Sequence, residues 1–407
     1  KKLKNEIISY IGDKENIGIL LSGGMDSRVV ATILNDLIID GFKLNVTAIT
    51  WGIKDSRDVI YAQKISKILQ WKWKYFELNS DTLVKNIEIA AKEGALYSPI
   101  HLHAMYEVSN LKNIDCIIAG SFGDSVGRAE YSGIHVSNLS TLSNSIFNRF
   151  KIIKSSIYNE YKEDVTNDIE YYNNIFPKDK LYQRYEVEQE LHYMRKLLNP
   201  CMNLINKKIP LFHAFSSPSV FGYMWSLSPK VRTDQIYYNL LKLYSSNLLN
   251  IPWARTGSKY LDNQKSKPDT LLKNYHKYGI WIRKDLYPIL KEKVLSKEIE
   301  DLNIFNMKSI ERLFFINSFS KQIKNTKIDE ILIWLATLSD FVRNNNIIGV
   351  NPISTTLKDK FDGNIISIVH YIAFNLKVKI NKASKNEKYN FNRLKWYKTL
   401  PSNKKYK

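Results

Sequence analysis

The sequence predicts an α/β protein with a parallel sheet, and two observations lead to this prediction. Short apolar runs of strand character alternate with helical patterns, at residues 17–21, 45–51 and 116–119. The first and third runs lead directly into glycine-rich turns, S-G-G-M-D-S at 22–27 and G-S-F-G-D-S at 120–125. Strands that alternate with helices form right-handed βαβ units, and their ligands lie at the carboxyl ends of the strands.

The sequence of the first half of the chain predicts the following helices and strands. Residues 1–11 have an amphipathic helical pattern, and a second helix should follow the first glycine-rich turn, because apolar positions continue to Leu34 and Leu37. The strand at 45–51 precedes a good helical pattern that begins at Asp55. A third short strand is expected at 74–78, and a long helical region at 81–110 is interrupted at Pro99.

The sequence of the second half of the chain predicts mostly helices. Residues 141–180 are polar and rich in Asn and Tyr, which predicts a mobile loop or insertion near the site. Helical patterns follow at residues 181–198, 220–227, 235–249, 288–295, 309–319 and 328–344. We therefore expect an α/β core at 1–140, a mostly helical part at 141–345 and a basic extension at 346–407. A chain of 407 residues is long enough for two or three domains.

Composition limits the class of protein. Hydrophobic residues make up 44% of the chain, which supports a substantial core, and no apolar run approaches the roughly 20 residues that span a bilayer. The first residues lack the apolar region and cleavage site of a signal peptide. Cys116 and Cys201 stand in apolar or mixed surroundings and are expected to be buried thiols. These features predict a cytoplasmic protein without a transmembrane segment.

The formal net charge of +20 is concentrated at one end of the sequence. Eleven Lys and Arg residues, against Glu387 alone, lie within the last 32 residues, together with several aromatic side chains. Such a segment can bind RNA or lipid headgroups, or it can be a solvated tail, and the tail is the interpretation that we favour. Nucleic acid is therefore a possible but not a favoured partner.

The two glycine-rich turns predict a polyphosphate site. Ser22, Gly23 and Gly24 allow a tight turn that a ligand can approach closely, and the following helix N-terminus favours an anion. Asp26 is placed to bind the divalent ion that accompanies a polyphosphate, and Asp124 in the second turn can share that ion. His101 and His103 would diverge on a helix, which argues against a shared metal site.

The motif L-S-G-G-M-D-S resembles the pyrophosphate-binding loop of the N-type ATP pyrophosphatase (PP-loop) superfamily. Further segments resemble the synthetase domain of glutamine-hydrolysing asparagine synthetase and its relatives, including β-lactam synthetase. They are I-T-W-G at 49–52, I-I-A-G-S-F-G-D at 117–124, the segment 209–229 and I-P-W-A-R-T-G at 251–257. The resemblance covers most of residues 17–344. It implies a PP-loop (HUP-like) ATP pyrophosphatase core with additional C-terminal helices.

The resemblance implies an ATP-dependent ligase that makes amides. Such enzymes convert a carboxylate to an acyl-adenylate with release of pyrophosphate, and ammonia or an amine then displaces AMP. The roles carried over are adenosine contacts for Leu21, Trp51, Ala119 and Gly120, pyrophosphate contacts for Ser22, Gly23, Gly24 and Ser27, and Mg²⁺ ligation for Asp26 and Asp124. Arg255 would neutralise charge on the phosphates. Arg28 and Arg128 are weaker candidates for substrate or phosphate contacts.

Three departures from the family pattern affect the expected chemistry. Ser121 and Ser125 replace acidic or tyrosyl residues, and a serine is a poor general base, so the nucleophile is a free amine or another group substitutes. Glu130, Glu188 and a histidine are the candidates. His213 stands where the family has an aspartate, and the glutaminase domain is absent. Ammonia must then come from solution, from a separate glutaminase subunit or from a removed N-terminal domain.

The sequence therefore predicts a ligase that acts on a small-molecule or sugar carboxylate other than free aspartate. Two rival hypotheses remain. A tRNA-modifying enzyme of the same superfamily, such as a lysidine synthetase or a thiolase, is suggested by the net charge, although the C-x-x-C pairs of a thiolase are missing. A nucleotide-binding partner without catalytic activity is suggested by the missing base.

Overall fold

The computed structural model describes residues 1–130, 147–175, 181–259, 269–351, 354–373 and 375–376. Its centre is a five-stranded sheet with the order β3-β2-β1-β4-β5, in which every neighbouring pair is parallel. The strands are β1 (Asn16–Leu20), β2 (Asn45–Gly52), β3 (Lys72–Glu77), β4 (Cys116–Ala119) and β5 (Leu211–His213). The predicted α/β class with a parallel sheet is confirmed.

Both faces of the sheet are buried because β1 and β4 are apolar at nearly every position. Ile17 and Ile19 face one core with the helices α1 (Lys2–Ile11), α2 (Met25–Ile39), α3 (Arg57–Ile68) and α10 (Asp234–Tyr244). Leu20 points to the opposite face, as the two-residue period of a strand requires. There it meets the helices α4 (Ser80–Lys92), α5 (Met105–Ser109) and α8 (Asn199–Asn206). Cys116 and Cys201 are buried free thiols, as predicted.

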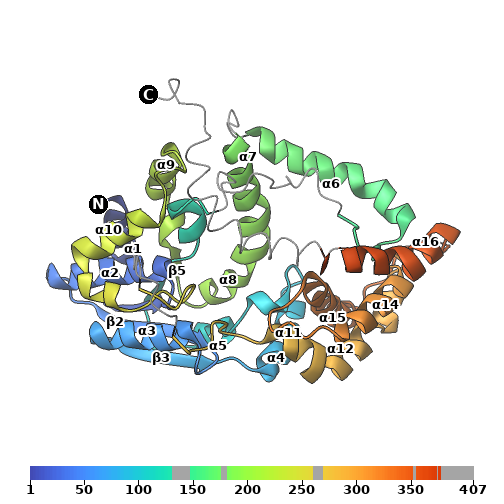
Figure 1. The fold of residues 1–407 in the computed structure, drawn as a ribbon, viewed down its shortest axis with the longest axis horizontal. Coiled ribbons are helices and arrows are strands. Elements are labelled where there is room, and N and C mark those ends of the chain that lie inside the picture. Colours follow the sequence, from blue (N-terminus) through green and yellow to red (C-terminus); the bar gives the residue numbers. More distant parts are fainter. Residues whose placement is uncertain (131–146, 176–180, 260–268, 352–353, 374, 377–407) are drawn as a thin grey trace.

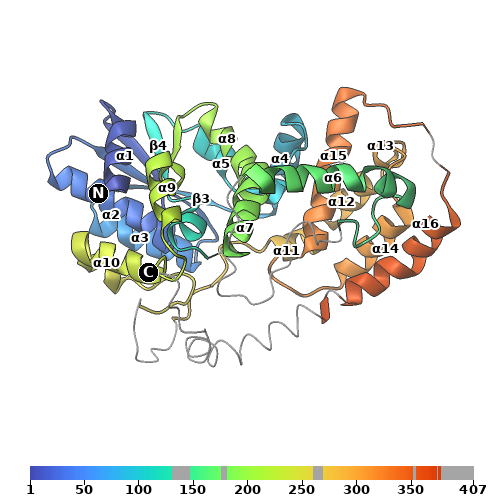
Figure 2. The same ribbon diagram turned by 90° about the horizontal axis from the view of Figure 1, so that it is seen from above.

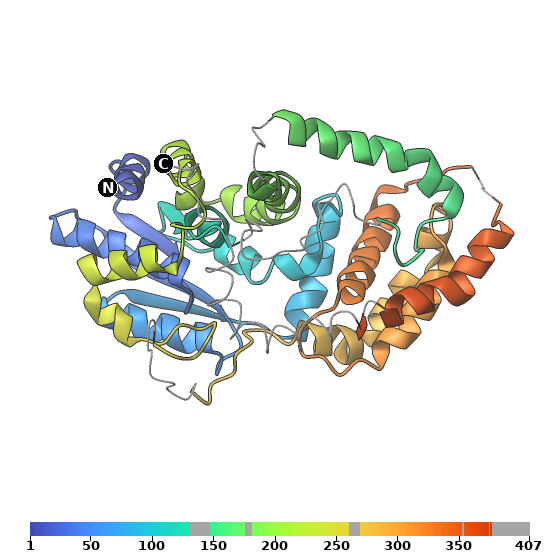
Figure 3. The same cartoon turned by 45° about the horizontal axis from the view of Figure 1, so that its top comes forward.

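The helices of residues 278–366 form a second lobe, which lies beside the sheet lobe in Figures 1 and 2. The helices of this lobe and their connecting turns are α11 (Tyr278–Ile280), η7 (Trp281–Asp285), α12 (Tyr287–Val294), α13 (Lys297–Glu300), α14 (Met307–Ser318), α15 (Lys327–Asn345), α16 (Leu357–Phe361) and η8 (Asp362–Ile366). Their core includes Leu83 and Ile87 of α4. Helix α4 therefore contributes to both lobes, and α15 packs along it, as Figure 3 shows. The additional C-terminal helices are confirmed.

One helical region differs from the prediction. Residues 155–175 form the 21-residue helix α6 (Ser155–Ile175) rather than a loop. Only Ile169 and Asn173 of this helix are buried, so it has no apolar stripe for periodicity to reveal. The rest of the predicted loop lies partly outside the described residues. Helix α7 (Leu181–Glu188) and the π-helical η4 (Gln189–Leu198) follow, and α9 (Pro218–Ser226) precedes α10.

The predicted domain boundaries stay a prediction. Strand β5, which was not predicted, comes from the segment assigned to the second domain and pairs with β4 of the first. The last 31 residues of the basic extension lie outside the described residues. Within the described ranges, no helix combines the length and the apolar character that crossing a bilayer needs.

Candidate nucleotide-binding site

The predicted adenosine-contacting residues lie together at the carboxyl edge of the sheet. Leu21 continues β1 and donates its backbone N–H to Ile49 O at 2.9 Å, and Trp51 is the penultimate residue of β2. Ala119 ends β4, the other neighbour of β1, and Gly120 follows it. The carboxyl ends of adjacent parallel strands are where α/β sheets bind nucleotides. The structure thus brings the four residues to the expected edge.

The first glycine-rich loop is closed by two hydroxyl groups. The Ser27 hydroxyl lies 3.3 Å from the Ser22 hydroxyl and accepts a hydrogen bond from Ser22 N–H at 3.2 Å. Gly24 N–H donates to Ser22 Oγ at 3.1 Å, immediately before α2 begins at Met25. This arrangement forms a short, fixed turn at a helix N-terminus, the geometry that favours an anion.

The second loop packs directly on the first because glycines stand at the contacts. A Cβ atom on Gly120 would lie 2.7 Å from Ser27 N, and one on Gly123 would lie 2.8 Å from Asp26 Oδ1. Phe122 adopts the left-handed region, at φ 68°, and the π-helical turn η2 (Gly123–Gly127) follows it. π-helical turns and left-handed residues other than glycine are frequent at functional sites. Asp124 is thereby held beside Asp26.

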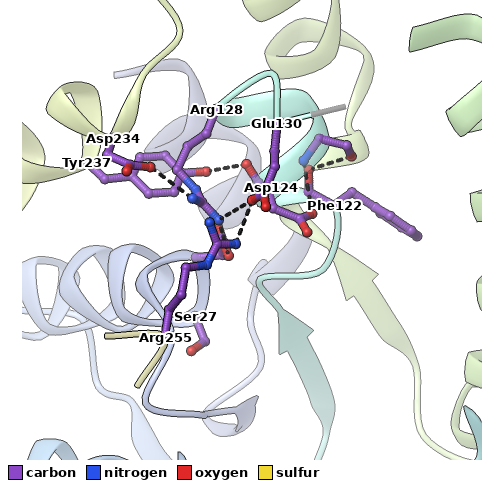
Figure 4. Close-up of polar contacts among 12 residues, drawn as sticks. Ser27, Phe122, Asp124, Arg128, Glu130, Asp234, Tyr237 and Arg255 are labelled. Carbon is purple, nitrogen blue, oxygen red and sulfur yellow. Dashed lines mark hydrogen bonds and ion pairs between the residues drawn. The ribbon is translucent and has the colours of Figure 1, made fainter. Parts of the chain in front are cut away.

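Arg128 is the centre of a charged network beside the two glycine-rich loops (Figure 4). Its Nε and Nη2 atoms donate to the two carboxylate oxygens of Asp26 at 3.1 and 3.2 Å, and its Nη1 donates to Asp234 at 2.9 Å. Glu130 lies 3.5 Å from Arg128 and accepts a hydrogen bond from Arg255 at 2.6 Å. Two guanidinium groups therefore share one acidic cluster, and Arg255 is the more exposed of the two.

Asp124 differs from Asp26 because, among the described residues, it forms no direct ion pair with a Lys or Arg, although the charge of Arg128 partly offsets the rise in its pKa. It accepts a hydrogen bond from its neighbour Ser125 N–H at 2.9 Å. Burial raises the pKa of Asp124 to about 6, and the negative charge of Asp26 acts in the same direction. A bound cation would therefore stabilise the ionised form of Asp124.

The pair of carboxylates fits a divalent ion, with one condition. Mg²⁺ prefers carboxylate oxygens, and both residues offer them at adjacent positions. However, both oxygens of Asp26 accept hydrogen bonds from Arg128, so an ion at Asp26 competes with this guanidinium. No group of three or more His, Cys, Asp or Glu side chains in the described part of the chain is arranged to hold a metal. The ligand set would thus be completed by phosphate oxygens and water.

The guanidinium of Arg28 binds backbone carbonyl groups and is not free to contact a phosphate. Its guanidinium is fully buried and donates to the carbonyl oxygens of Gly23, Leu248, Ile251 and Pro252 at 2.8–3.2 Å. These bonds fasten the segment 248–252 to the first loop. The contacts assign Arg28 a structural role and give no support to the predicted contact with substrate.

The loop 251–257 lies beside the first glycine-rich loop, as the resemblance implied. Ala254 N–H donates to Gly23 O at 3.1 Å, and a Cβ atom on Gly23 would approach Ala254 Cβ to 2.9 Å. Arg255 follows in sequence and lies over the Trp253 ring, with its Cζ atom 4.7 Å from the ring centroid. Its position near the loop agrees with the prediction, while its catalytic role stays a prediction.

The predicted histidines occupy half-buried positions around the sheet edge. His103 stacks on Trp51 at 5.8 Å between ring centroids, and its Nδ1 lies 2.7 Å from the Tyr278 hydroxyl. His213 ends β5 and packs against Phe122, with its Nδ1 buried and without a hydrogen-bond partner. Burial lowers the pKa of His213 to about 4, so its ring is neutral near pH 7. His213 is therefore a neutral, half-buried ring at the carboxyl end of β5.

Three residues beside the two glycine-rich loops were not predicted from the sequence. Asp234 and Tyr237 stand one turn apart on α10, where Tyr237 donates its hydroxyl hydrogen to Gly123 O at 2.8 Å. Glu190 of η4 hydrogen-bonds Ser125, and burial raises its pKa to about 7. Of the candidates named instead, Glu188 bonds Asn173 and Arg184 away from the loops, while Glu130 lies in this cluster but is paired with Arg255. The spacing of Glu186 and Glu190, four residues apart in a helical pattern, was the available signal.

Comparison with known protein families gives a match to part of the chain. A family model described as asparagine synthase matches residues 11–159. No curated protein matches the chain. Among solved structures, the U34-tRNA thiolase NcsA from Methanococcus maripaludis, with its 4Fe-4S cluster, is similar at 14% identity over 61% of this chain and 78% of the thiolase, with a TM-score of 0.23. A TM-score of this size supports no inference about fold or activity. The chain is therefore similar to the asparagine synthase family over residues 11–159, which contain β1 to β4 and both glycine-rich loops.

Proposed function

We propose that the protein is an ATP-dependent carbon–nitrogen ligase that activates a substrate carboxylate as an acyl-adenylate. The observation that carries the proposal is the contact between two glycine-rich loops at neighbouring strand ends, with Asp26 and Asp124 close enough for their charges to interact. ATP, bound with Mg²⁺, supplies the electrophilic α-phosphorus and the pyrophosphate leaving group. The match of residues 11–159 to the asparagine synthase family supports the use of ATP.

The residues of the site then have distinct tasks. The N–H groups and hydroxyls of the loop 22–27 bind the pyrophosphate portion, and Asp26 and Asp124 hold the ion. Arg255 neutralises the charge that grows on the leaving pyrophosphate, because it is a preorganised cation beside that loop. An ion held by Asp26 would take the place of the Arg128 hydrogen bonds there, and the bond to Asp234 would still position Arg128.

The proposed acyl substrate is a small-molecule or sugar carboxylate other than aspartate. The half-buried, neutral His213 next to Phe122 supports this, since it cannot reproduce the charge of the family aspartate. Ammonia or an amine then displaces AMP. Glu190, which was not predicted, interacts with both Ser125 and Asp124, and a pKa of about 7 suits a group that accepts a proton at neutral pH.

The test is pyrophosphate release from Mg-ATP in the presence of a panel of carboxylates that includes aspartate and uronic acids. Asp124→Asn removes one proposed ligand charge, and Asp13→Asn is the matched control at an exposed aspartate of the same lobe. We expect release that depends on one class of acid, survives in Asp13→Asn and falls at least about a hundredfold in Asp124→Asn.

Two results would overturn the proposal. Pyrophosphate release that requires tRNA and no carboxylate would indicate a nucleic-acid-modifying enzyme of the same superfamily. ATP binding without turnover, with every acid and with ammonia present, would indicate a nucleotide-binding partner that lacks catalysis.

A further inference from the structure

Arg128 satisfies both oxygens of Asp26, one of the two residues assigned to a divalent ion. Its Nε and Nη2 atoms donate to these oxygens at 3.1 and 3.2 Å, and its Nη1 atom is held by Asp234 at 2.9 Å. Two parallel hydrogen bonds between a guanidinium and a carboxylate are among the strongest polar contacts in proteins. An ion that binds Asp26 therefore competes with a cation that is already in place.

Glu130 is a second acceptor within reach of the same guanidinium. Its Oε2 atom lies 3.5 Å from Arg128 Nη2, the atom that donates to Asp26 Oδ2. This distance is slightly longer than a hydrogen bond, so a small movement of Arg128 closes it. The backbone of Glu130 is fixed to the second loop, because its N–H donates to Asp124 O at 2.9 Å. Arg128 can thus exchange Asp26 for Glu130 while its bond to Asp234 stays.

Arg255 already uses the oxygen that Arg128 would take. Its Nη2 atom donates to Glu130 Oε2 at 2.6 Å, so two guanidinium groups meet at one carboxylate oxygen, as Figure 4 shows. The Arg255 side chain is 45% exposed, whereas the Arg128 side chain is 4% exposed and has Asp234 as a further partner. A closer approach of Arg128 weakens the bond of the second cation by repulsion. Arg255 is therefore the group that leaves Glu130.

We propose that an exchange of ion pairs couples metal binding at Asp26 to the release of Arg255. In the resting protein Arg128 holds Asp26, and Glu130 holds Arg255. When Mg-ATP binds, Arg128 transfers to Glu130, and Arg255 turns to the pyrophosphate portion from the segment 251–257, which is bonded to the first loop. Arg128 and Glu130 are then positioning residues. The inference rests on the proposed nucleotide site, and it does not depend on which acid is activated.

The first experiment measures Mn²⁺ binding to the full chain by electron paramagnetic resonance, without nucleotide and without acid. Arg128→Lys keeps the positive charge but replaces the planar guanidinium by a single ammonium group. Arg343→Lys is the matched control, since Arg343 forms a half-exposed ion pair with Glu298 in the helical lobe. Asp26→Asn/Arg128→Lys tests whether gained binding is at Asp26. Thermal unfolding reports whether each variant keeps the fold.

We expect Arg128→Lys to bind Mn²⁺ at least about fivefold more tightly than the wild type and the control, and the double variant to lose this gain. The wild type should bind Mn²⁺ tightly once ATP is added. Equal Mn²⁺ affinities of Arg128→Lys and the wild type, with Mn-ATP still bound, would overturn the exchange and leave the nucleotide site standing. A gain that survives in the double variant would also overturn it. Absence of Mn-ATP binding would overturn both proposals.

The second experiment tests the release of Arg255 and leaves Arg128 unaltered. Glu130→Gln removes the charge that holds Arg255, so inorganic pyrophosphate should bind at least about fivefold more tightly in calorimetric titrations with EDTA present. Glu298→Gln, at the acid of the half-exposed pair, is the matched control and should bind like the wild type. The gain should disappear in Glu130→Gln/Arg255→Met. No gain, or a gain that persists in this double variant, would contradict the release of Arg255.

Discussion

Asp124 is the residue at which the electrostatics of the site can be tested by pH. Its folded-state pKa of about 6 lies above the ordinary value, so the folded protein loses stability as Asp124 ionises. Without metal, Asp124→Asn should therefore be more stable than the wild type above pH 6, by about 2 kcal/mol, and equally stable below pH 4. Denaturant unfolding across this range measures the difference. A constant difference at all pH values would contradict the assigned burial.

Gly123 tests the close approach of the two loops. A methyl group there would lie 2.7 Å from Asp26 Cβ and 2.9 Å from the Phe215 ring, so Gly123→Ala should lower kcat/KM for pyrophosphate release at least about tenfold. Gly222→Ala is the matched control, because no atom lies within 4 Å of the new methyl group in the exposed helix α9. It should keep full activity and stabilise the fold by up to about 1 kcal/mol.

At the residue scale, sequence motifs predicted which groups meet but not how they pair. S-G-G-M-D-S and S-F-G-D identified Asp26 and Asp124, because these turns combine local geometry with a recognisable pattern. The motifs could not show that Arg128 binds both oxygens of Asp26. They also could not show the contacts of Asp234 and Tyr237 with the second loop, because these two residues lie more than a hundred positions further along the sequence. Such contacts depend on how α10 packs on α2, which no local pattern specifies.

At the element scale, Arg28 connects the start of α2 to the segment 248–252. Replacement by methionine keeps the length of the side chain but leaves buried carbonyl groups without donors, so Arg28→Met should lower the free energy of unfolding by about 3 kcal/mol. Arg343→Met removes a half-exposed ion pair with Glu298 and should cost less than about 1 kcal/mol. Chemical denaturation compares the two, and equal losses would contradict the structural role of Arg28.

The elements that the sequence predicted well are those with strong periodicity. Strands β1, β2 and β4 are apolar runs bounded by turns, and α15 has a capping box from Thr326 and Asp329 that marks its start. Strand β5 was missed because three half-buried residues give no pattern. Helix α6 was missed because its exposed polar surface resembles that of a loop.

At the scale of the whole molecule, α4 joins the two lobes. Leu83 of α4 is fully buried in the core of the helical lobe, and Trp334 of α15 donates its indole N–H to Ala95 O just beyond α4, at 2.8 Å. Leu83→Ala should destabilise the protein by about 2–5 kcal/mol. Because the lobes share this helix, nucleotide binding and far-ultraviolet circular dichroism should report one coincident unfolding transition. Two separate transitions would contradict a shared core.

The central claim is that a carboxylate attacks the α-phosphorus of ATP. The most direct measurement uses the acid found in the pyrophosphate assay, labelled with ¹⁸O in its carboxyl group, and analyses the nucleotide product by mass spectrometry. The account predicts one ¹⁸O atom in AMP, because the acyl-adenylate passes a carboxylate oxygen to the phosphate when the amine displaces it. Label in inorganic phosphate together with ADP, or AMP without label, would contradict it.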